Sequence, residues 1–586
     1  MSLDHYTLGF SFALGHGTSG VLLKNGHVAA AANLERLLQM KYAWLSNPEV
    51  EDDTIRDIAA KTPQKKPIPI QEHFERLLDY LLSAAGISLS DVSLVAYDKY
   101  SCATSPYRTT VEGTNAFLDS FFKGKDVVRV EHHVGHQAQA FYPSPFEEAA
   151  ILTVDGGSYD ELPRLGNVPQ SSSIAHGKGR RIETLLENIG EGISGKEYMR
   201  TTVYIGFGLN EDGKTMGLAP YGGPDIHDQI KVKLKYRLNP FYRRRHTIRP
   251  EYDFPRDTFH KFCKDVRAKH HKDFMAKPCR DLAWAVQKRI EERVIRAARA
   301  AHELTGSKNL VYAGGVALNS VANRKILQET PFERIFVYPN AGDCGLAAGY
   351  ALWAYYNTTD GPRQYVARHD YLGKPYSDRA VQTALDRFAG RIRVQRIPRK
   401  GDPGATEGRF MESVIADRIA GGEIVGWFQG GAEFGPRALG HRSILCDCRK
   451  PEHKDILNAR VKHREGFRPF APAVPLARQK DYFDLDVESP YMLLVPEVHP
   501  HMREVVPAIT HVDGTARVQT VTPEDNDAYY TLIDEFGKKT GVYVILNTSF
   551  NLAGKPIVET PADAIESFLS TQMDALVVED CLIEKK

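Results

Sequence analysis

Three histidines lie within five consecutive positions of the stretch "EHHVGHQAQ", residues 131–139. If a helix begins at His132, the side chains of His132 and His136 project from the same face, four residues apart, whereas His133 points elsewhere. Only His132 and His136 could then hold one ligand together. The spacing leaves three interpretations open, which are metal ligands, catalytic bases, and polar residues along a solvated helix edge.

Polar residues and glycines at the ends of apolar strands form a second group of candidates. The apolar stretch "AILTV" runs into Asp155, and "NLVYA" runs into Gly314 and Gly315 just before a predicted helix. In α/β sheets, ligands bind at such strand ends, where glycine lets the backbone approach a phosphate closely. Each turn on its own also fits an ordinary tight connection between a strand and a helix.

The second half of the chain carries cations beside glycine, proline and aromatic residues. Converging arginines would hold a small dianion, because the guanidinium fork binds phosphate or carboxylate oxygens in pairs. Each cation on its own also fits a surface ion pair. Asn547 ends the apolar stretch "VYVIL", and we interpret it as a binding residue, since no nearby histidine or lysine is spaced to activate a serine nucleophile. The cations are Arg437, Arg442, Lys462, Arg464, Arg468 and Arg517.

The elements that must position these residues fall into at least two domains, because 586 residues exceed one hydrophobic core. The stretches "YTLGFSF" and "GVLLKNGHVAAAANLERLL" predict a β-hairpin with an Asn-Gly turn. Together with the later glycine-turn strands, they suggest two like halves, as in the duplicated fold of actin-like ATPases. A polar stretch after "GLAAGYALWAYYN" predicts the boundary, so we expect domains at residues 1–365 and 366–586.

Composition excludes some function classes. Lysine plus arginine is 75 and aspartate plus glutamate is 74, so no bulk attraction to nucleic acid or a membrane is expected. The N-terminus lacks a signal-peptide pattern, and no run of about 18 apolar residues occurs, which predicts a cytoplasmic protein. The seven cysteines include no paired CxxC motifs, so reduced structural thiols are expected rather than a zinc site.

Nine motifs, in order along nearly the whole chain, resemble those of the NodU/CmcH carbamoyltransferases. They are "HHVGHQAQAFYPSPF", "ILTVDGG", "GKTMGLAPYG", "GGVALNS", "GDCGLAAG", "FGPRALGHRSIL", "VKHREGFRPFAP", "HVDGTARVQTV" and "NTSFNLAGKPIVETPADA".

The resemblance implies an α/β enzyme of two domains. The N-terminal domain would be a duplicated actin-like ATPase (ASKHA) domain, similar to the tRNA threonylcarbamoyl-transfer protein, and the C-terminal domain would be a YrdC-like α/β domain. It further implies that the C-terminal domain hydrolyses carbamoyl phosphate to carbamate and joins this to the AMP part of ATP, releasing pyrophosphate. The N-terminal domain would then transfer the carbamoyl group to an acceptor hydroxyl.

The same resemblance implies roles for individual residues. His132, His136, Asp155 and Asp343 would hold a divalent metal, for which family precedent favours iron(II), with manganese or zinc as alternatives. The nucleotide would lie along Gly314, Gly315, Val316 and Asn319, with Lys214 a weaker candidate for the transfer cavity. Carbamoyl phosphate and the nucleotide phosphates would be gripped by Arg437, Lys462, Arg468, Arg517 and Asn547. His16 matches the histidine near the acceptor, where it would act as general base on the hydroxyl.

Two motifs depart from the family pattern. The usual "HDASA" is "HGTSG" here, with Gly17 in place of an aspartate, and the usual "EERFTRxKH" is "LERLLQMKY", residues 34–42. We expect both to lie near the acceptor, which leaves the identity of the acceptor open.

The leading hypothesis is an ATP- and carbamoyl-phosphate-dependent O-carbamoyltransferase that acts on a small hydroxylated metabolite of a biosynthetic, secondary-metabolite pathway. It needs neither nucleic acid nor a membrane, and a homodimer stays open. A tRNA-modifying enzyme of the threonylcarbamoyl type is the alternative, and the neutral net charge disfavours it. A non-catalytic ATP-dependent binding module is the third hypothesis, and the C-terminal arginines argue against it.

Overall fold

The chain folds into two compact units, which we call the first and the second unit. The first comprises residues 1–34 and 42–367, and the second comprises residues 35–41 and 368–586. The structure, a computed structural model, describes residues 4–13, 17–46, 67–99, 108–162, 166–187, 195–208, 210–226, 235–238, 248–251, 256–270, 273–406 and 408–586.

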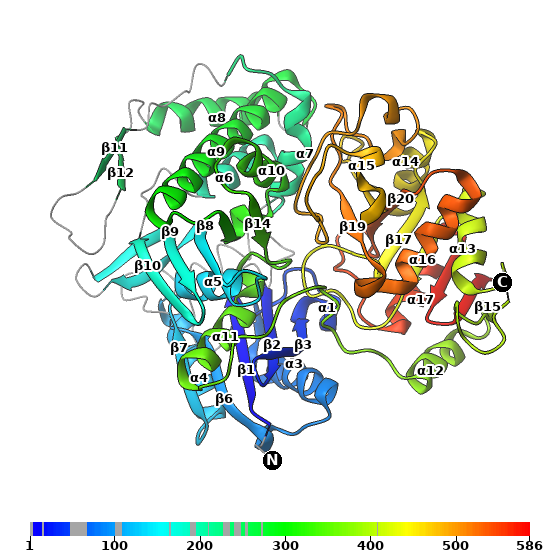
Figure 1. Cartoon of the computed structure of the whole chain (residues 1–586), viewed down its shortest axis with the longest axis horizontal. Coiled ribbons are helices and arrows are strands. Elements are labelled where there is room, and N and C mark those ends of the chain that lie inside the picture. Colours follow the sequence, from blue (N-terminus) through cyan, green and yellow to red (C-terminus); the bar gives the residue numbers. More distant parts are fainter. Residues whose placement is uncertain are drawn as a thin grey trace. The chain divides into compact units, whose positions relative to one another are not determined.

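Two five-stranded sheets with the same topology form the centre of the first unit (Figure 1). One has the order β3-β2-β1-β6-β7 and the other β10-β9-β8-β13-β14. In each sheet the first three strands pair antiparallel and the last two join in parallel. The strands are β1 (Tyr6–Ala13), β2 (Gly17–Lys24), β3 (His27–Asn33), β6 (Val92–Asp98), β7 (Asp126–Val130), β8 (Glu148–Leu162), β9 (Gly166–Lys178), β10 (Arg181–Glu187), β13 (Asn309–Ala313) and β14 (Arg334–Val337).

This repeated topology confirms the predicted duplicated actin-like fold of the N-terminal part. The predicted hairpin is also present, with β2 and β3 joined at Asn25 and Gly26. Both residues have positive φ, 51° and 80°, the conformation that a two-residue Asn-Gly turn requires. The hairpin register then places the apolar residues of β2, such as Val21 and Leu23, in the core.

Two helices occupy equivalent places in the two halves of this unit and position the candidate site described below. Helix α5 (His132–Phe141) follows β7, the last strand of the first sheet, and packs on β8 and β13 of the second sheet. Helix α11 (Leu346–Thr358) follows β14, the last strand of the second sheet, and packs on β1 and β6 of the first. The two helices also contact each other, so the turns that precede them lie close together at the centre of this unit.

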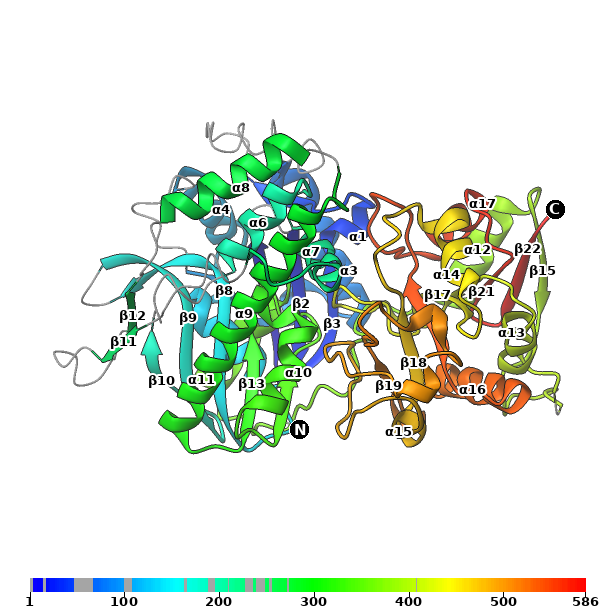
Figure 2. The same ribbon diagram turned by 90° about the horizontal axis from the view of Figure 1, so that it is seen from above.

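Further helices and short strands surround these sheets. Figure 2 shows the long helix α9 beside α10, and the two are in contact. The elements are α3 (Ile70–Ala85), α4 (Arg108–Phe121), α6 (Lys196–Ile205), α7 (Asp212–Leu218), α8 (Arg256–His270), α9 (Lys277–Thr305), α10 (Ser320–Glu329), β4 (Trp44–Ser46), β5 (Pro67–Pro69), β11 (Lys235–Leu238) and β12 (Ile248–Glu251).

The second unit is an α/β domain around one mixed sheet of eight strands. The strand order is β15-β22-β21-β16-β17-β20-β18-β19. The strands are β15 (Ile392–Arg396), β16 (Val425–Phe428), β17 (Arg442–Asp447), β18 (Ala471–Pro475), β19 (Gln519–Val521), β20 (Ile545–Ser549), β21 (Ala575–Val578) and β22 (Cys581–Lys585). The helices are α12 (Asp378–Phe388), α13 (Met411–Ala420), α14 (Glu452–Leu457), α15 (Gln479–Tyr482), α16 (Pro523–Thr540) and α17 (Pro561–Leu569).

The core of the second unit lies between this sheet and two helices. Ile415 of α13 and Phe536 of α16 pack with Trp427 of β16 in one cluster of buried apolar side chains. Burying a large apolar side chain stabilises a fold by about 1.5–3 kcal/mol, so this cluster gives the sheet a rigid base. Among the helices that the structure describes, none combines the length and apolar character that crossing a bilayer requires.

Candidate active sites

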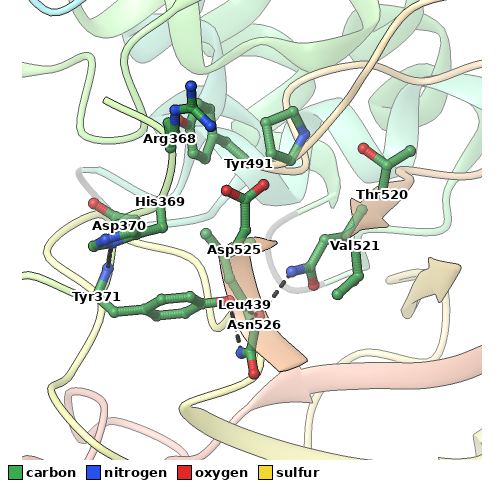
Figure 3. Close-up of a pocket in the computed structure, with 12 residues that line it drawn as sticks. Arg368, His369, Asp370, Tyr371, Leu439, Tyr491, Thr520, Val521, Asp525 and Asn526 are labelled. Carbon is green, nitrogen blue, oxygen red and sulfur yellow. Dashed lines mark hydrogen bonds between the residues drawn. The ribbon is translucent and has the colours of Figure 1, made fainter. Parts of the chain in front are cut away.

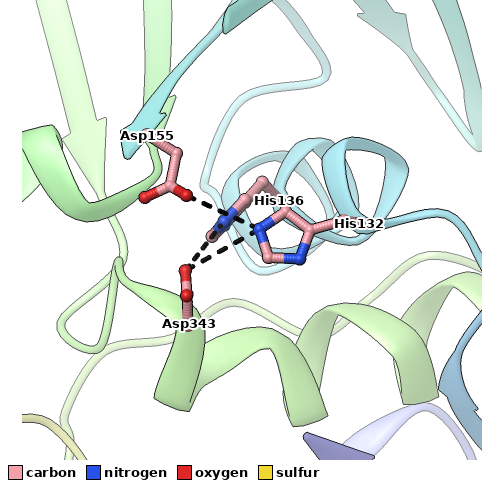
Figure 4. Close-up of side chains that lie close together, drawn as sticks. All are labelled: His132, His136, Asp155 and Asp343. Carbon is pink, nitrogen blue, oxygen red and sulfur yellow. Dashed lines mark ion pairs between the residues drawn. The ribbon is translucent and has the colours of Figure 1, made fainter. Parts of the chain in front are cut away.

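Four side chains of the first unit point toward one another (Figure 4). They belong to His132, His136, Asp155 and Asp343. Helix α5 supplies the two histidines, β8 supplies Asp155, and the turn before α11 supplies Asp343. One ligand atom from each lies within 4.8 Å of all the others. The helix predicted from His132 is confirmed, and its four-residue spacing places both imidazoles on one face.

The distances within this cluster suit a shared cation. Nε2 of His136 lies 3.4 Å from Oδ1 of Asp343, and Nε2 of His132 lies 3.6 Å from Oδ2 of Asp155. Ligand atoms at about 2.1 Å from one metal ion stand roughly 3.0–3.4 Å apart in tetrahedral or octahedral coordination. Small side-chain movements would therefore complete such a shell.

Neighbouring groups shift the pKa values of His132 and His133 in opposite directions. Burial opposes the charged form of His132, but Asp155, Asp98 and Asp343 outweigh it and raise its pKa well above the ordinary value. His133 differs, because burial and the two neighbouring histidines lower its pKa to about 3. Its Nδ1 lies 2.9 Å from Oγ1 of Thr153. His133 is thus a buried core residue whose ring contacts Thr153 of β8.

Outer contacts orient the four side chains. Nδ1 of His136 lies 2.9 Å from Oε1 of Gln139, and Nδ1 of His132 lies 3.4 Å from Oδ2 of Asp98. The backbone N–H of Gly315 donates to Oδ1 of Asp155 at 2.9 Å. Such contacts fix the ring orientation of a metal-binding histidine and leave its other nitrogen facing the ligand. Asp98 ends the apolar strand β6, the same signal that marked Asp155, so the sequence could have revealed it.

The residues present fit a divalent metal. Nε2 of His132 and of His136 is buried and makes no hydrogen bond within the described residues. A buried polar atom in that state is costly unless a ligand meets it. Two imidazoles with two carboxylates are a donor set for iron(II), manganese or zinc rather than for calcium. The donor set by itself does not select among these three metals.

The predicted nucleotide-binding residues lie in the turn between β13 and α10, next to Asp155. Gly314 has φ of 94°, and a Cβ there would stand 2.2 Å from the carbonyl oxygen of Val154, so the close approach requires glycine. The N–H of Gly315 already binds Asp155, and Val316 is buried in the short helical turn that follows. Asn319 caps α10 by accepting from the N–H of Ala322 at 3.1 Å.

Of the other two predicted residues of this unit, the structure describes Lys214. Lys214 lies on α7, where its Nζ pairs with Glu211 at 2.8 Å and lies 5.6 Å from the ring centre of Phe207. His16 lies outside the described residues, so its role as general base stays a prediction.

In the second unit, several cations gather with few carboxylates beside them among the described residues. Nζ of Lys462 is almost fully buried and donates to Asn551 Oδ1 at 2.7 Å and to the carbonyl oxygen of Ser549 at 2.8 Å. The described residues include one ion pair for this cluster, between Arg468 and Glu465 at 3.6 Å. We call it the cation cluster, and its members are Arg437, Lys462, Arg464, Arg468 and Arg517.

These cations destabilise one another. Burial and Arg468 lower the pKa of Arg437 to about 10, and burial with Arg468 lowers the pKa of Arg464 to about 9. Burial, then Arg437, Arg464 and Arg468, lower the pKa of Arg517 well below its ordinary value. Like charges held together in a low-dielectric site carry a free-energy cost that a bound anion removes. The cluster therefore has the electrostatics of a binding site for a polyanion.

Two residues of the cation-rich motifs contact the backbone of the second unit. Arg442 is fully buried, donates to the carbonyl oxygens of Gln429 and Gly430, and lies 3.5 Å from the ring centre of Phe428. It supports the backbone. Asn547, also buried, donates to the carbonyl oxygen of Ala438 at 3.1 Å and so touches the turn that carries Arg437. Sequence reasoning missed Asn551, which accepts from the buried Lys462 beside the cluster.

The segment of residues 35–41 corrects one expectation. The departure "LERLLQMKY" was expected in the N-terminal domain, but residues 35–41 belong to the second unit. Its place near the acceptor stays a prediction. Arg36 donates there to the carbonyl oxygens of Glu433 and Gly435, and Gln39 donates to that of Ile557 at 3.3 Å. Such a long-range contact could not be predicted from the sequence. No local signal shows that helix α1 (Leu34–Leu38) packs with residues more than three hundred positions later in the chain.

Known protein families match segments of both units. The model of the carbamoyltransferase N-terminus matches residues 71–352, and that of the carbamoyltransferase C-terminus matches residues 416–585. The chain is 34% identical to an uncharacterized protein of Synechocystis over 99% of its own length and 97% of the relative. It is 35% identical to nodulation protein NolNO of Sinorhizobium fredii, with 97% of this chain and 79% of the relative covered. It is 31% identical to the 3'-hydroxymethylcephem-O-carbamoyltransferase of Streptomyces clavuligerus, with 64% of each chain covered. The chain therefore belongs to the carbamoyltransferase family and is a transferase enzyme.

Proposed function

We propose that this enzyme is an O-carbamoyltransferase that uses carbamoyl phosphate and ATP and carbamoylates a hydroxyl group of a small metabolite. The observation that carries the proposal is the cation cluster. Five buried or half-buried cations with a single described ion pair favour a ligand with several negative charges, and carbamoyl phosphate and ATP both provide them.

The proposed chemistry divides between the units. In the second unit, water cleaves carbamoyl phosphate to carbamate and phosphate. A carbamate oxygen then attacks the α-phosphorus of ATP, which forms carbamoyl adenylate and releases pyrophosphate. Arg437, Arg468 and Arg517 would bind the phosphate oxygens in pairs, and Lys462 would add a point charge. Asn547 would position the carbamoyl group.

The first unit would carry out the transfer. The acceptor hydroxyl attacks the carbamoyl carbon, AMP leaves, and the hydroxyl proton passes to a base, for which His16 is the proposed residue. His132, His136, Asp155 and Asp343 would hold the divalent metal, which when bound would neutralise phosphate charge on the leaving AMP. Gly314, Gly315, Val316 and Asn319 would line the nucleotide. We further propose that iron(II) is the resident metal.

The relatives support an acceptor with a hydroxyl group without identifying it. The Streptomyces clavuligerus relative is named for carbamoylation of a hydroxymethyl oxygen, and the same bond type is proposed here. The near-zero net charge, +1, agrees with a small-molecule acceptor rather than a tRNA.

The test uses the purified full-length enzyme with carbamoyl phosphate and ATP but no acceptor. We expect pyrophosphate in solution and carbamoyl adenylate detectable by mass spectrometry. The formation of neither product would overturn the proposal. ADP with phosphate in their place would point to a simple ATPase. A panel of hydroxylated metabolites, screened by mass spectrometry for carbamoylated products, would then identify the acceptor.

A further inference from the structure

Arg36 is a buried arginine from the start of the chain that lies in the second unit. Its side chain is 4% exposed, and its two terminal nitrogens donate to the carbonyl oxygens of Glu433 and Gly435. Charge-assisted hydrogen bonds of this kind are about twice as strong as neutral ones when water is excluded. A guanidinium can reach two carbonyls that lie two residues apart, whereas the single ammonium group of a lysine cannot match that fork.

The two carbonyls belong to the turn between β16 and β17, residues 429–441, which we call the β16–β17 turn. This turn is wound around the buried carboxylate of Glu433. Its Oε1 accepts from the N–H groups of Leu439 at 2.6 Å and His441 at 2.9 Å. Arg36 therefore binds the turn at the residue around which the rest of the turn is folded.

A second support reaches the same turn from residues 370 and 371. Oδ2 of Asp370 accepts from the N–H of Gly435 at 2.7 Å. The hydroxyl of Tyr371 donates to the carbonyl oxygen of Leu439 at 2.7 Å (Figure 3). The Tyr371 ring stacks on His441 with centroids 3.6 Å apart. Arg36 and these residues together leave the turn little freedom.

The β16–β17 turn carries Arg437 into the cation cluster. Its carbonyl oxygens also accept from Asn547, at Ala438, and from Gln519, at Leu439. Burial and the neighbouring charge of Arg468 both lower the pKa of Arg437. A cation held against repulsion needs a rigid backbone, because a loose turn would move it out toward solvent. The rigidity of the β16–β17 turn thus determines the position of the Arg437 guanidinium.

We propose that Arg36 is a positioning residue for the anion site of the second unit, and that the segment of residues 35–41 is a working part of that site. Arg36 acts through the β16–β17 turn and Arg437 and does not touch the substrate. This inference rests on the proposed use of carbamoyl phosphate. It implies that the second unit is incomplete when it is cut from the chain at residue 366.

The experiment compares full-length Arg36→Met and Arg36→Lys with wild type and with a control, Arg418→Met. Arg418 is a guanidinium of the same unit that pairs with Glu423 and Glu584. Pyrophosphate release is measured while carbamoyl phosphate is varied at saturating ATP. We expect Arg36→Met to raise KM for carbamoyl phosphate at least about tenfold, since small misplacements of binding groups cost rates of that order. Arg36→Lys should show a smaller increase, and Arg418→Met none.

Two further readouts separate positioning from loss of fold. Added N-methylguanidinium should lower the raised KM of Arg36→Met and leave the control unchanged. A purely structural role would reduce the amount of active enzyme and leave KM unaltered, and that result would overturn the inference. If Arg36→Met does not fold, KM of Arg36→Lys decides the question in the same way. Absence of pyrophosphate from the wild type would instead refute the proposed function.

Discussion

Oδ2 of Asp98 lies 3.4 Å from Nδ1 of His132, the ring nitrogen opposite the one that faces Asp155 and Asp343. The same Asp98 oxygen accepts a hydrogen bond from the hydroxyl of Tyr350 on α11. This buried contact connects β6 to α5, which carries His132 and His136, and to α11, which follows Asp343. It also fixes which nitrogen of His132 is available to a cation.

Replacing Asp98 should therefore weaken metal binding without removing a ligand. We expect Asp98→Asn to reduce metal affinity about 10- to 100-fold, the usual effect of losing a carboxylate behind a metal-binding histidine. Affinity is measured by competition with a chelator. Asp119→Asn is the control, because Asp119 is a half-exposed partner of Arg129 in the same unit. Equal affinity in Asp98→Asn and wild type would contradict this prediction.

The two histidines on the shared face of α5 should be required for metal retention. We expect His132→Ala and His136→Ala each to lose bound metal, as measured by elemental analysis of the purified protein. His133→Gln should keep it, because glutamine can still bond Thr153 and His133 does not face the cluster. Unchanged metal content in both alanine variants would show that the cluster is not a metal site.

Removing a cation from the cluster should impair use of carbamoyl phosphate. Arg517→Ala is expected to raise KM for carbamoyl phosphate, or to lower the rate of pyrophosphate release, by about 10- to 100-fold, the equivalent of one or two charge-assisted hydrogen bonds. The metal content of the first unit should not change. Arg396→Ala is the control, since Arg396 makes an exposed ion pair with Asp580. Wild-type kinetics in Arg517→Ala would contradict the role of Arg517 in binding carbamoyl phosphate.

Asp370 should make stability depend on pH. Burial, with the repulsion from Glu433, raises the pKa of Asp370 to about 8 despite the hydrogen bond from Gly435. Between about pH 4 and pH 8 the folded chain then keeps a proton that the unfolded chain has lost. The contribution of this carboxyl to stability therefore falls as pH rises through that window and levels off above pH 8.

Asp370→Asn removes that dependence and keeps an oxygen that can accept from Gly435. We expect its gain in the free energy of unfolding, relative to wild type, to be larger at pH 8 than at pH 5 by on the order of 3–4 kcal/mol. Denaturant titration at the two pH values measures it. Asp580→Asn is the control, because its carboxyl has a lowered pKa and does not titrate in this range. Equal gains at both pH values would show that Asp370 is ionised in the folded protein.

Local sequence signals predicted what local geometry determines. The Asn25-Gly26 turn followed from the conformations that those residues adopt, and the helix at His132 followed from residue spacing. Asp155 was recognised as a strand end. The family motifs then identified His132, His136, Asp155 and Asp343 as one group, and the structure brings these four side chains together.

What could not be predicted depends on contacts between distant segments. Arg36 binds carbonyls of residues almost four hundred positions later, and no periodicity marks that pairing. Likewise, Arg442 and Arg437 share one motif, yet one is a buried support and the other belongs to the cation cluster. Arg442 begins β17 and donates to backbone carbonyls, whereas Arg437 lies in the turn beside Arg468, and these positions depend on the folded turn.

The central claim is that activation and transfer occur in different units of one chain. The most direct measurement is the yield of carbamoyl adenylate from His136→Ala, supplied with carbamoyl phosphate and ATP in the presence of an acceptor. We predict that the variant releases pyrophosphate and accumulates carbamoyl adenylate, while the carbamoylated product is lost. If His136→Ala forms neither pyrophosphate nor carbamoyl adenylate, activation depends on the first unit and the division of labour is contradicted.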